Sequence, residues 1–346
     1  MNLKKVILSV LVVFFVVGCF MLSGFSFFKK AKVDVSTKNM SEYSAIQDKL
    51  WCVTFQLVWN ELSEKFVKGT VNLVGGNPPI VDELNKKLYT ADILSENSYY
   101  ITWGKISKDL KKQIEKDIKK KFNETSDILG MINWNAKNSY LFYTMLKKNF
   151  TFIEPFDRLD SAPFNASKEN VKYFGIQKST NNKVKNNVAV LFYNSPDEYA
   201  VKLSTKENED VILFRTNMED TFENYFGYIL KNSYMTKFSK KDIMLIPDII
   251  VDELISYDEL SGKQIEGTDF VISKAIQTIK FKLDNKGGSL KSEAALTVME
   301  TAFRPEQETP RYFLFNKPFV LFLMEAGKEK PYYAMKIDNT DFLVKE

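Results

Sequence analysis

The hydrophobic pattern of the sequence changes near Asn138, and this change restricts the possible folds more than any other feature. Before it, apolar residues recur at helical spacing over residues 47–66, from about residue 80, and over residues 107–122. After it come runs of residues typical of β-strands: 140–145, 188–193, 199–203, 211–214, 243–251, 276–283, 319–324 and 332–337. Helices followed by many strands predict an α+β fold, with N-terminal helices packed on large mixed or antiparallel sheets.

The last two strand-like runs, 319–324 and 332–337, are apolar at nearly every position. A strand that is apolar on both faces is typical of the middle of a sheet. Residues 325–328 separate the two runs and contain Gly327. We therefore expect a C-terminal hairpin of two central strands.

The chain contains no histidine. This excludes Ser-His-Asp and Cys-His hydrolases, and metal sites that need imidazole. The remaining candidates for acid–base catalysis are adjacent acids, Asp252 with Glu253 and Asp258 with Glu259. Neighbouring acids on a solvated turn are typical of surface charge. We expect a protein that is not an enzyme, with no catalytic residue, metal, cofactor or small-molecule substrate.

The net charge of +4 comes from four lysines that flank an N-terminal apolar segment: Lys4, Lys5, Lys29 and Lys30. Without them, 44 basic and 44 acidic residues remain in the body of the chain. Nucleic-acid binding usually requires a basic excess on one face. The balanced charge therefore argues against a nucleic-acid partner.

Residues 6–28 form an uncharged, mostly apolar run that is long enough to span a bilayer. Three interpretations remain open: a retained signal-anchor, a lipoprotein signal acylated at Cys19, or a signal that is removed completely. Each exports the rest of the chain, and the first two tether it to the cell membrane. We expect an extracytoplasmic, membrane-anchored protein. Cys52 is the only other cysteine, so an internal disulfide within the exported body is excluded.

The expected organisation is a signal over residues 1–30, a polar stalk over 31–45, and one domain over 46–346. Within that domain, residues 46–137 form a helical part and residues 138–346 a β-rich part. A long connection, 287–314, separates two of the expected core strands, although compact domains typically use connections of about 4–6 residues. Its middle, Ser292 to Met299, alternates small and β-branched residues. It could be a segment that adds a strand to a sheet, or a plain surface helix over 292–301.

Residues 138–340 resemble the serpins, a superfamily of metastable protease inhibitors. The similarity is most specific in 315–325 (FNKPFVLFLME) and 332–339 (YYAMKIDN), which resemble the strand after the serpin reactive-centre loop and the closing strand. Five further segments also resemble serpin segments, and they follow the same order along the chain: 155–157, 162–164, 245–247, 256–260 and 272–287. The resemblance implies an exposed loop over 287–314 that a protease cleaves and that inserts into a β-sheet.

The resemblance also names site residues. The insertion hinge corresponds to Ser292, Glu293, Ala294 and Ala295, and the bait region to Arg304, Pro305, Glu306 and Gln307. The sequence departs from the family at several places. Residues 288–291 look like an insertion in the hinge, and burying Lys291 without a partner would cost several kcal/mol. Phe152 replaces an expected tryptophan, and the part before Asn138 is short for a serpin.

Two functions follow from the resemblance. The first is a membrane-tethered inhibitor of a serine or cysteine protease. The second is a non-inhibitory serpin-like binding module at the cell surface, which the short N-terminal part and the hinge insertion favour. An enzyme that uses paired carboxylates is a third hypothesis, which the absence of histidine disfavours.

Overall fold

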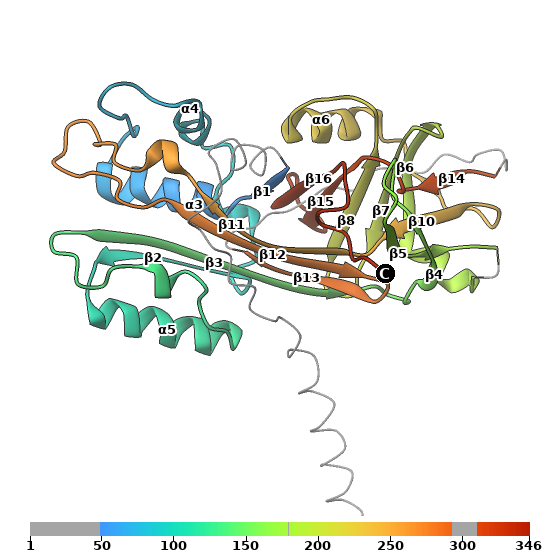
Figure 1. The fold of residues 1–346 in the computed structure, drawn as a ribbon, viewed down its shortest axis with the longest axis horizontal. Coiled ribbons are helices and arrows are strands. Elements are labelled where there is room, and N and C mark those ends of the chain that lie inside the picture. Colours follow the sequence, from blue (N-terminus) through green and yellow to red (C-terminus); the bar gives the residue numbers. More distant parts are fainter. Residues whose placement is uncertain (1–48, 179, 293–309) are drawn as a thin grey trace, which may run out of the picture. The chain divides into compact units, whose positions relative to one another are not determined.

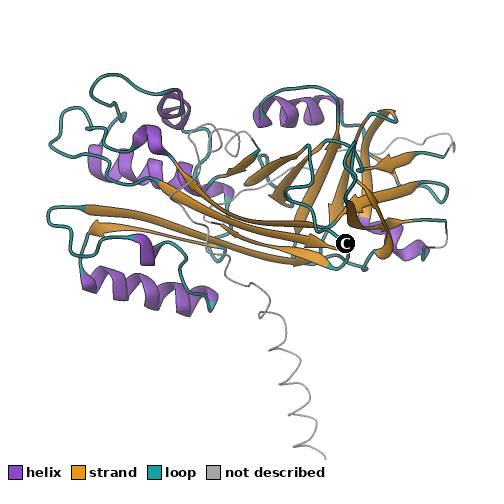
Figure 2. Cartoon of the chain, in the orientation of Figure 1, coloured by secondary structure: helices purple, strands orange, loops and turns teal. Residues whose placement is uncertain are grey.

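The computed structural model describes residues 49–178, 180–292 and 310–346, which lie within one compact unit, Met40–Glu346. Three sheets of seven, five and four strands make up most of this unit (Figures 1 and 2). The predicted α+β fold with large antiparallel sheets is confirmed. No helix within the described ranges is long and apolar enough to cross a membrane.

The seven-stranded sheet is antiparallel throughout. In spatial order its strands are β1 (Leu50–Cys52), β16 (Tyr333–Ile337), β15 (Phe319–Glu325), β8 (Glu209–Arg215), β7 (Glu198–Ser204), β6 (Val188–Ser195) and β9 (Thr236–Lys237). β15 is buried at every position and pairs with β16, so the expected hairpin of central strands is confirmed. Helix α6 (Phe222–Asn232) packs Tyr225, Phe226 and Ile229 against one face of this sheet.

The four-stranded sheet contains β14 (Tyr312–Leu314), β10 (Ile243–Pro247), β5 (Asn170–Ile176) and β4 (Asp157–Pro163), in that order. β14 runs parallel to β10, and the other pairs are antiparallel. Gly175 lies on β5 at φ +157°, where a Cβ would meet the carbonyl oxygen of Met244 at 2.0 Å. The close approach of β5 and β10 therefore requires glycine at this position.

The five-stranded sheet has the order β11 (Ile249–Ser256), β12 (Ile276–Asp284), β13 (Gly287–Ser292), β3 (Tyr140–Thr151) and β2 (Tyr99–Lys105). Side chains alternate between its two faces. One face carries Tyr143 and Met145 of β3, which pack against Ile114 and Ile118 of helix α5 (Lys108–Phe122). The other face joins the main core beneath helix α3 (Thr54–Glu61) and the seven-stranded sheet.

The predicted helix over 107–122 is confirmed as α5, and the Ser107 hydroxyl accepts a hydrogen bond from the Leu110 amide at 3.1 Å. The helix expected over 47–66 begins only at Thr54, because Leu50 to Cys52 pair with β16. A π-helical turn, Leu62–Val67, continues α3, and α4 spans Pro79–Asn85. Short 3₁₀ turns span Ala91–Ile93, Leu129–Met131, Asn182–Asn187 and Asp258–Leu260.

The prediction of one exposed loop over residues 287–314 needs correction at both ends. Residues 287–292 form β13, a central strand of the five-stranded sheet, and residues 312–314 form β14. The sequence signal was weak because Gly287, Gly288 and Ser289 have low strand propensity. At each end of residues 287–314, the described residues therefore form a strand that is hydrogen-bonded to neighbouring strands.

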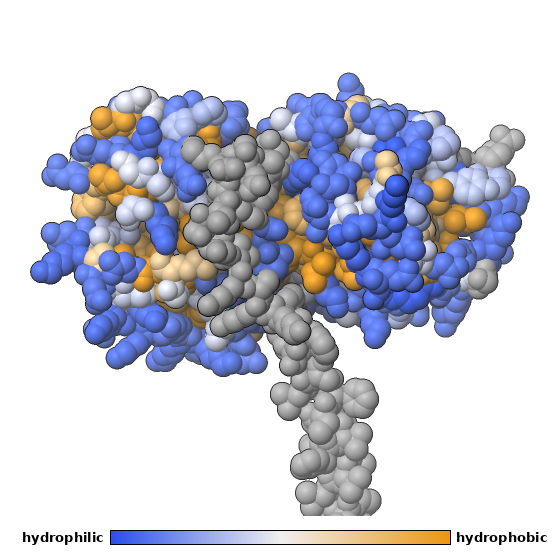
Figure 3. All heavy atoms as spheres, in the orientation of Figure 1, coloured by the Kyte–Doolittle hydropathy of each residue, from blue (hydrophilic) through white to orange (hydrophobic). Residues whose placement is uncertain are grey.

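The surface drawn in Figure 3 is mainly hydrophilic, with separate hydrophobic patches among hydrophilic residues. Half-exposed or exposed aromatic residues include Trp103 of β2 and Tyr140 of β3, each 37% exposed.

Candidate functional site

The candidate site is built around β13, which returns directly after β12 through the turn at Asn285 and Lys286. β13 is antiparallel to both neighbours: Leu290 lies opposite Phe281 of β12 and opposite Lys148 of β3. β12, the strand before the long connection, is thus followed directly by β13, which lies in the centre of the same sheet. Figure 1 shows β12, β13 and β3 running side by side beneath the seven-stranded sheet.

Two glycines allow β13 to fit between its neighbours. A Cβ on Gly288 would lie 2.6 Å from the Lys282 carbonyl oxygen and 2.6 Å from Phe150 Cζ. Gly287 has φ +147°, and a Cβ there would lie 2.2 Å from the Phe150 carbonyl oxygen. These separations are below van der Waals contact, so a larger residue would force the strands apart.

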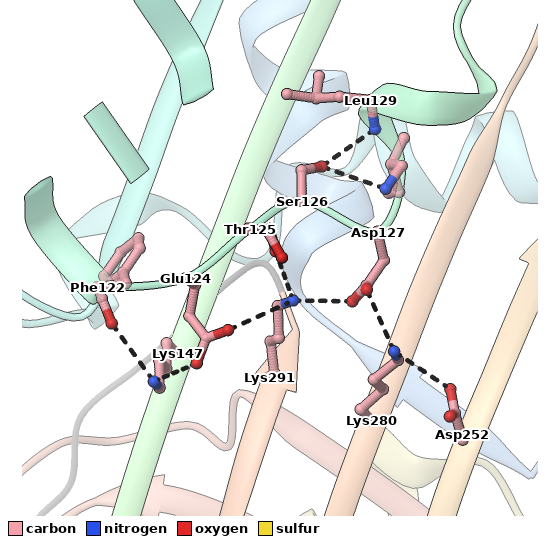
Figure 4. Close-up of polar contacts among 11 residues, drawn as sticks. Phe122, Glu124, Thr125, Ser126, Asp127, Leu129, Lys147, Asp252, Lys280 and Lys291 are labelled. Atoms are coloured by element: carbon pink, nitrogen blue, oxygen red, sulfur yellow. Dashed lines mark hydrogen bonds and ion pairs between the residues drawn. The ribbon is translucent and has the colours of Figure 1, made fainter. Parts of the chain in front are cut away.

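On the α5 side of the sheet, two acids hold three lysines from three neighbouring strands (Figure 4). We name Glu124 and Asp127, with Lys147 of β3, Lys291 of β13 and Lys280 of β12, the lysine clasp. Asp127 contacts Lys291 at 2.8 Å and Lys280 at 3.2 Å, and Glu124 contacts Lys147 at 2.5 Å and Lys291 at 3.9 Å. Both acids lie in the loop that follows α5, so this loop ties α5 to β13.

The lysine clasp provides counter-charges for the Lys291 ammonium group. Without them, the burial of this group in the sheet would be energetically unfavourable. Lys291 also donates from this group to the Thr125 carbonyl oxygen at 2.8 Å, and its side chain is 20% exposed. Burial alone would raise the pKa of Asp127, but Lys291 and Lys280 outweigh this effect and hold that pKa below its ordinary value. Asp127 therefore stays charged and paired near neutral pH.

The sheet continues beyond the end of β13. Among the described residues, 140–145 of β3 pair only with β2, and 276–279 of β12 pair only with β11. A cavity of about 720 Å³ lies at this end of the sheet, lined by both strands and by residues of α3, including Phe55, Trp59, Phe142 and Ile276. The Thr144 hydroxyl borders the cavity and finds no hydrogen-bond partner among the described residues, although Thr144 is only 1% exposed.

The chain is also anchored just before β14. Arg311, just before β14, is buried and forms a two-pronged ion pair with Asp242, with Nη2 to Oδ2 at 2.8 Å and Nε to Oδ2 at 3.2 Å. Its guanidinium also donates to Thr236 and to the Lys237 carbonyl oxygen. Residues 293–309 thus connect two anchored ends, β13 with its clasp and β14 with Arg311.

Of the site residues predicted from sequence, Ser292 is the last residue of β13. Glu293, Ala294, Ala295, Arg304, Pro305, Glu306, Gln307 and the lipidation candidate Cys19 lie outside the described residues. The sequence indicates that Lys291 is costly to bury without a partner, but it does not indicate which residues pair with it. Glu124 and Asp127 lie far from it in sequence, and they carry no motif that would have revealed the contact.

No group of His, Cys, Asp or Glu residues in the described part of the chain could hold a metal ion. Cys52 is buried.

Comparison with known proteins gives similarity at the level of structure. No protein-family model matches the sequence, and no curated protein matches it. The chain is similar to the solved structure of Serpin48, a serpin of the insect Tenebrio molitor, with 11% identity over 86% of this chain and 93% of that one, at a TM-score of 0.47.

Two further solved structures are similar. One is a cleaved, loop-inserted ovalbumin mutant, with 10% identity over 86% of this chain and 96% of that one, at a TM-score of 0.46. The other is cleaved Serpin 42Da, with 12% identity over 79% of this chain and 73% of that one, at a TM-score of 0.43. Serpin48 and Serpin 42Da are serpins, and the likeness of this chain to all three structures is one of fold at low sequence identity.

Proposed function

We propose that this protein is a serpin-like protease inhibitor, in which a protease cuts the segment 293–309 and the freed segment extends β13 into the five-stranded sheet. The observation that carries the proposal is the position of β13. It fills only one end of the space between β3 and β12, and both neighbours continue beyond it. Strand addition between two such edges would form new backbone hydrogen bonds on both sides.

The register of β13 specifies how the extension would proceed. Continued by two residues, it brings Ala294 opposite Thr144 of β3 and Gln277 of β12. Both are buried, and both lie on the core face of the sheet, the face that carries Leu290. A small apolar side chain suits a position between two buried neighbours. The resemblance to serpins supports Ala294 as a hinge residue for the same reason.

The test is proteolysis of the full-length chain with a panel of serine and cysteine proteases. We expect one nick between residues 300 and 308, followed by a large rise in the thermal unfolding midpoint. A denaturant-resistant complex with the protease would establish inhibition. The matched control is Ala294→Arg, which leaves the bait region intact but places a charge in the core face of the sheet. This variant should be nicked without the rise in stability.

A non-inhibitory binding module is the second candidate, and one observation favours it. In the uncleaved chain β13 is already seated, and the lysine clasp holds it there. A sheet that is partly filled stores less free energy for a later insertion. If the nick leaves the unfolding midpoint of the natural sequence unchanged, the inhibitor proposal is wrong and the binding module is the better account.

We also propose that the protein is exported and tethered to the membrane through residues 1–30. The support is the Lys4–Lys5 pair before an uncharged apolar run. Fractionation of cells that express the full-length chain should place it with the membranes. Lipidation would add the mass of acyl chains at Cys19, and Cys19→Ser would remove that mass.

A further inference from the structure

A cluster of buried charges lies where the five-stranded and seven-stranded sheets meet. Lys148 of β3 contacts Glu209 of β8 with Nζ to Oε1 at 2.6 Å, and it also contacts Glu325 of β15. The Tyr332 hydroxyl donates to Glu209 Oε2 at 2.8 Å, and Ser95 donates to Glu325 from its hydroxyl and its amide. The side chains of Lys148, Glu209 and Glu325 are 7%, 4% and 12% exposed.

The charges in this cluster do not balance. Glu209 and Glu325 lie directly opposite each other on neighbouring strands, which places two carboxyl groups side by side. Lys148 is the one cation that contacts them in the described part of the chain. Two ionised carboxylates around a single buried ammonium leave an excess negative charge, and the nearby Glu325 carboxylate helps to raise the pKa of Glu209.

Burial, opposed only in part by Lys148 and Tyr332, raises the pKa of Glu209 to about 7. The groups that face this carboxyl are Lys148 from β3, Glu325 from β15 and Tyr332 from the segment before β16. β13 adds no charge on this side, because its residue opposite Lys148 is Leu290.

β13 borders the cluster at Lys148. Leu290 is fully buried and lies between Lys148 of β3 and Phe281 of β12, with all three side chains on the core face. Phe281 in turn contacts Tyr333, with ring centroids 5.0 Å apart. Removal of β13 would open a path for water along β3 to Lys148 and its two carboxylates.

We propose that Glu209, beside Lys148 and Glu325, is a proton-binding site coupled to β13, so that uptake of one proton by Glu209 favours the inserted strand. The proposal rests on the insertion function above and adds its regulation: mildly acidic conditions hold β13 in the sheet. The proton comes from water and resides on the Glu209 carboxyl.

The direction of the effect follows from linkage. With β13 seated, the dry environment raises the affinity of Glu209 for a proton. With β13 withdrawn, water lowers that affinity toward the ordinary value. The seated state therefore binds more protons, and its stability falls as pH rises from about 4.5 to about 7. Above that range the loss is complete.

Hydrogen exchange of the full-length chain tests the proposal, read on peptides that cover residues 287–292. After correction for intrinsic exchange rates, protection of β13 should rise about tenfold between pH 8 and pH 6, since one pH unit below the pKa is tenfold. Glu209→Gln should show no pH dependence and should be as protected at pH 8 as the natural sequence is at pH 6. The control is Glu329→Gln, an exposed acid in the same hairpin, which should keep the full pH dependence.

A second variant serves if Glu209→Gln does not fold. Tyr332→Phe removes a hydrogen bond that stabilises the ionised carboxyl, so the midpoint of the pH dependence should move to higher pH. Protection that does not change with pH in the natural sequence would overturn the proposal, and so would an equal rise in β4 and β5. Proteolysis reports separately on the inhibitor function, so a failure of that function and a failure of the proton coupling can be distinguished.

Discussion

At the scale of single residues, Gly288 sets how closely β13 can approach its neighbours. Its missing side chain leaves room for the Lys282 carbonyl oxygen, a backbone atom that cannot move without displacing β12. Gly288→Ala should therefore lower the free energy of unfolding by about 1–3 kcal/mol, the usual cost of overpacking a filled site. Urea unfolding of the full-length chain measures this change.

Gly69→Ala is the matched control, because a Cβ at Gly69 would meet no atom within 4 Å. It should change the free energy of unfolding by less than about 0.5 kcal/mol. Equal unfolding midpoints for the two variants would show that β13 is not held between β12 and β3 as described.

At the scale of elements, α5 supports β13 without touching its core face. Ile118 of α5 is fully buried with Tyr143 and Met145 of β3, and the loop after α5 carries both acids of the lysine clasp. Ile118→Ala should lower the free energy of unfolding by about 2–5 kcal/mol. It should also speed hydrogen exchange in β13, because the clasp loses its support.

Lys116→Ala provides the comparison for this helix. Lys116 is on the exposed face of α5, and its truncation should leave both the unfolding curve and the exchange of β13 nearly unchanged. Ile118→Ala could destabilise the chain but leave hydrogen exchange in β13 at its original rate. That result would show that the lysine clasp does not couple α5 to β13.

The elements differ in how well the sequence predicts them, for physical reasons. α5 was predictable because its apolar residues repeat at helical spacing and Ser107 caps it. β15 and β16 were predictable because burial on both faces leaves a continuous apolar run. β13 was not predictable in this way. Its glycines are needed because atoms of Lys282 and Phe150 lie close by, and the charge of Lys291 is balanced by acids in another element. Likewise, the local sequence does not distinguish Lys148, Glu209 and Glu325 from other charged residues, because they meet only when three strands pack together.

At the scale of the whole molecule, the sheet beyond β13 is the feature that separates the two proposed functions. Residues 140–145 of β3 and 276–279 of β12 have no partner on their inner edges among the described residues. If this space accepts the segment after β13, a free peptide with the sequence of residues 293–298 should compete for it. Such a peptide binds the folded chain and not the unfolded one, so it should raise the thermal unfolding midpoint in proportion to the logarithm of its concentration.

The same peptide also tests whether the segment and the space belong together. When it is bound before proteolysis, the nick between residues 300 and 308 should no longer raise the unfolding midpoint, because the space is already filled. A peptide with proline at its third position lacks one backbone N–H and cannot complete the ladder, so it should have neither effect. If both peptides act alike, the binding is not strand addition. If neither acts while cleavage still stabilises the chain, the freed segment must go somewhere other than between β3 and β12.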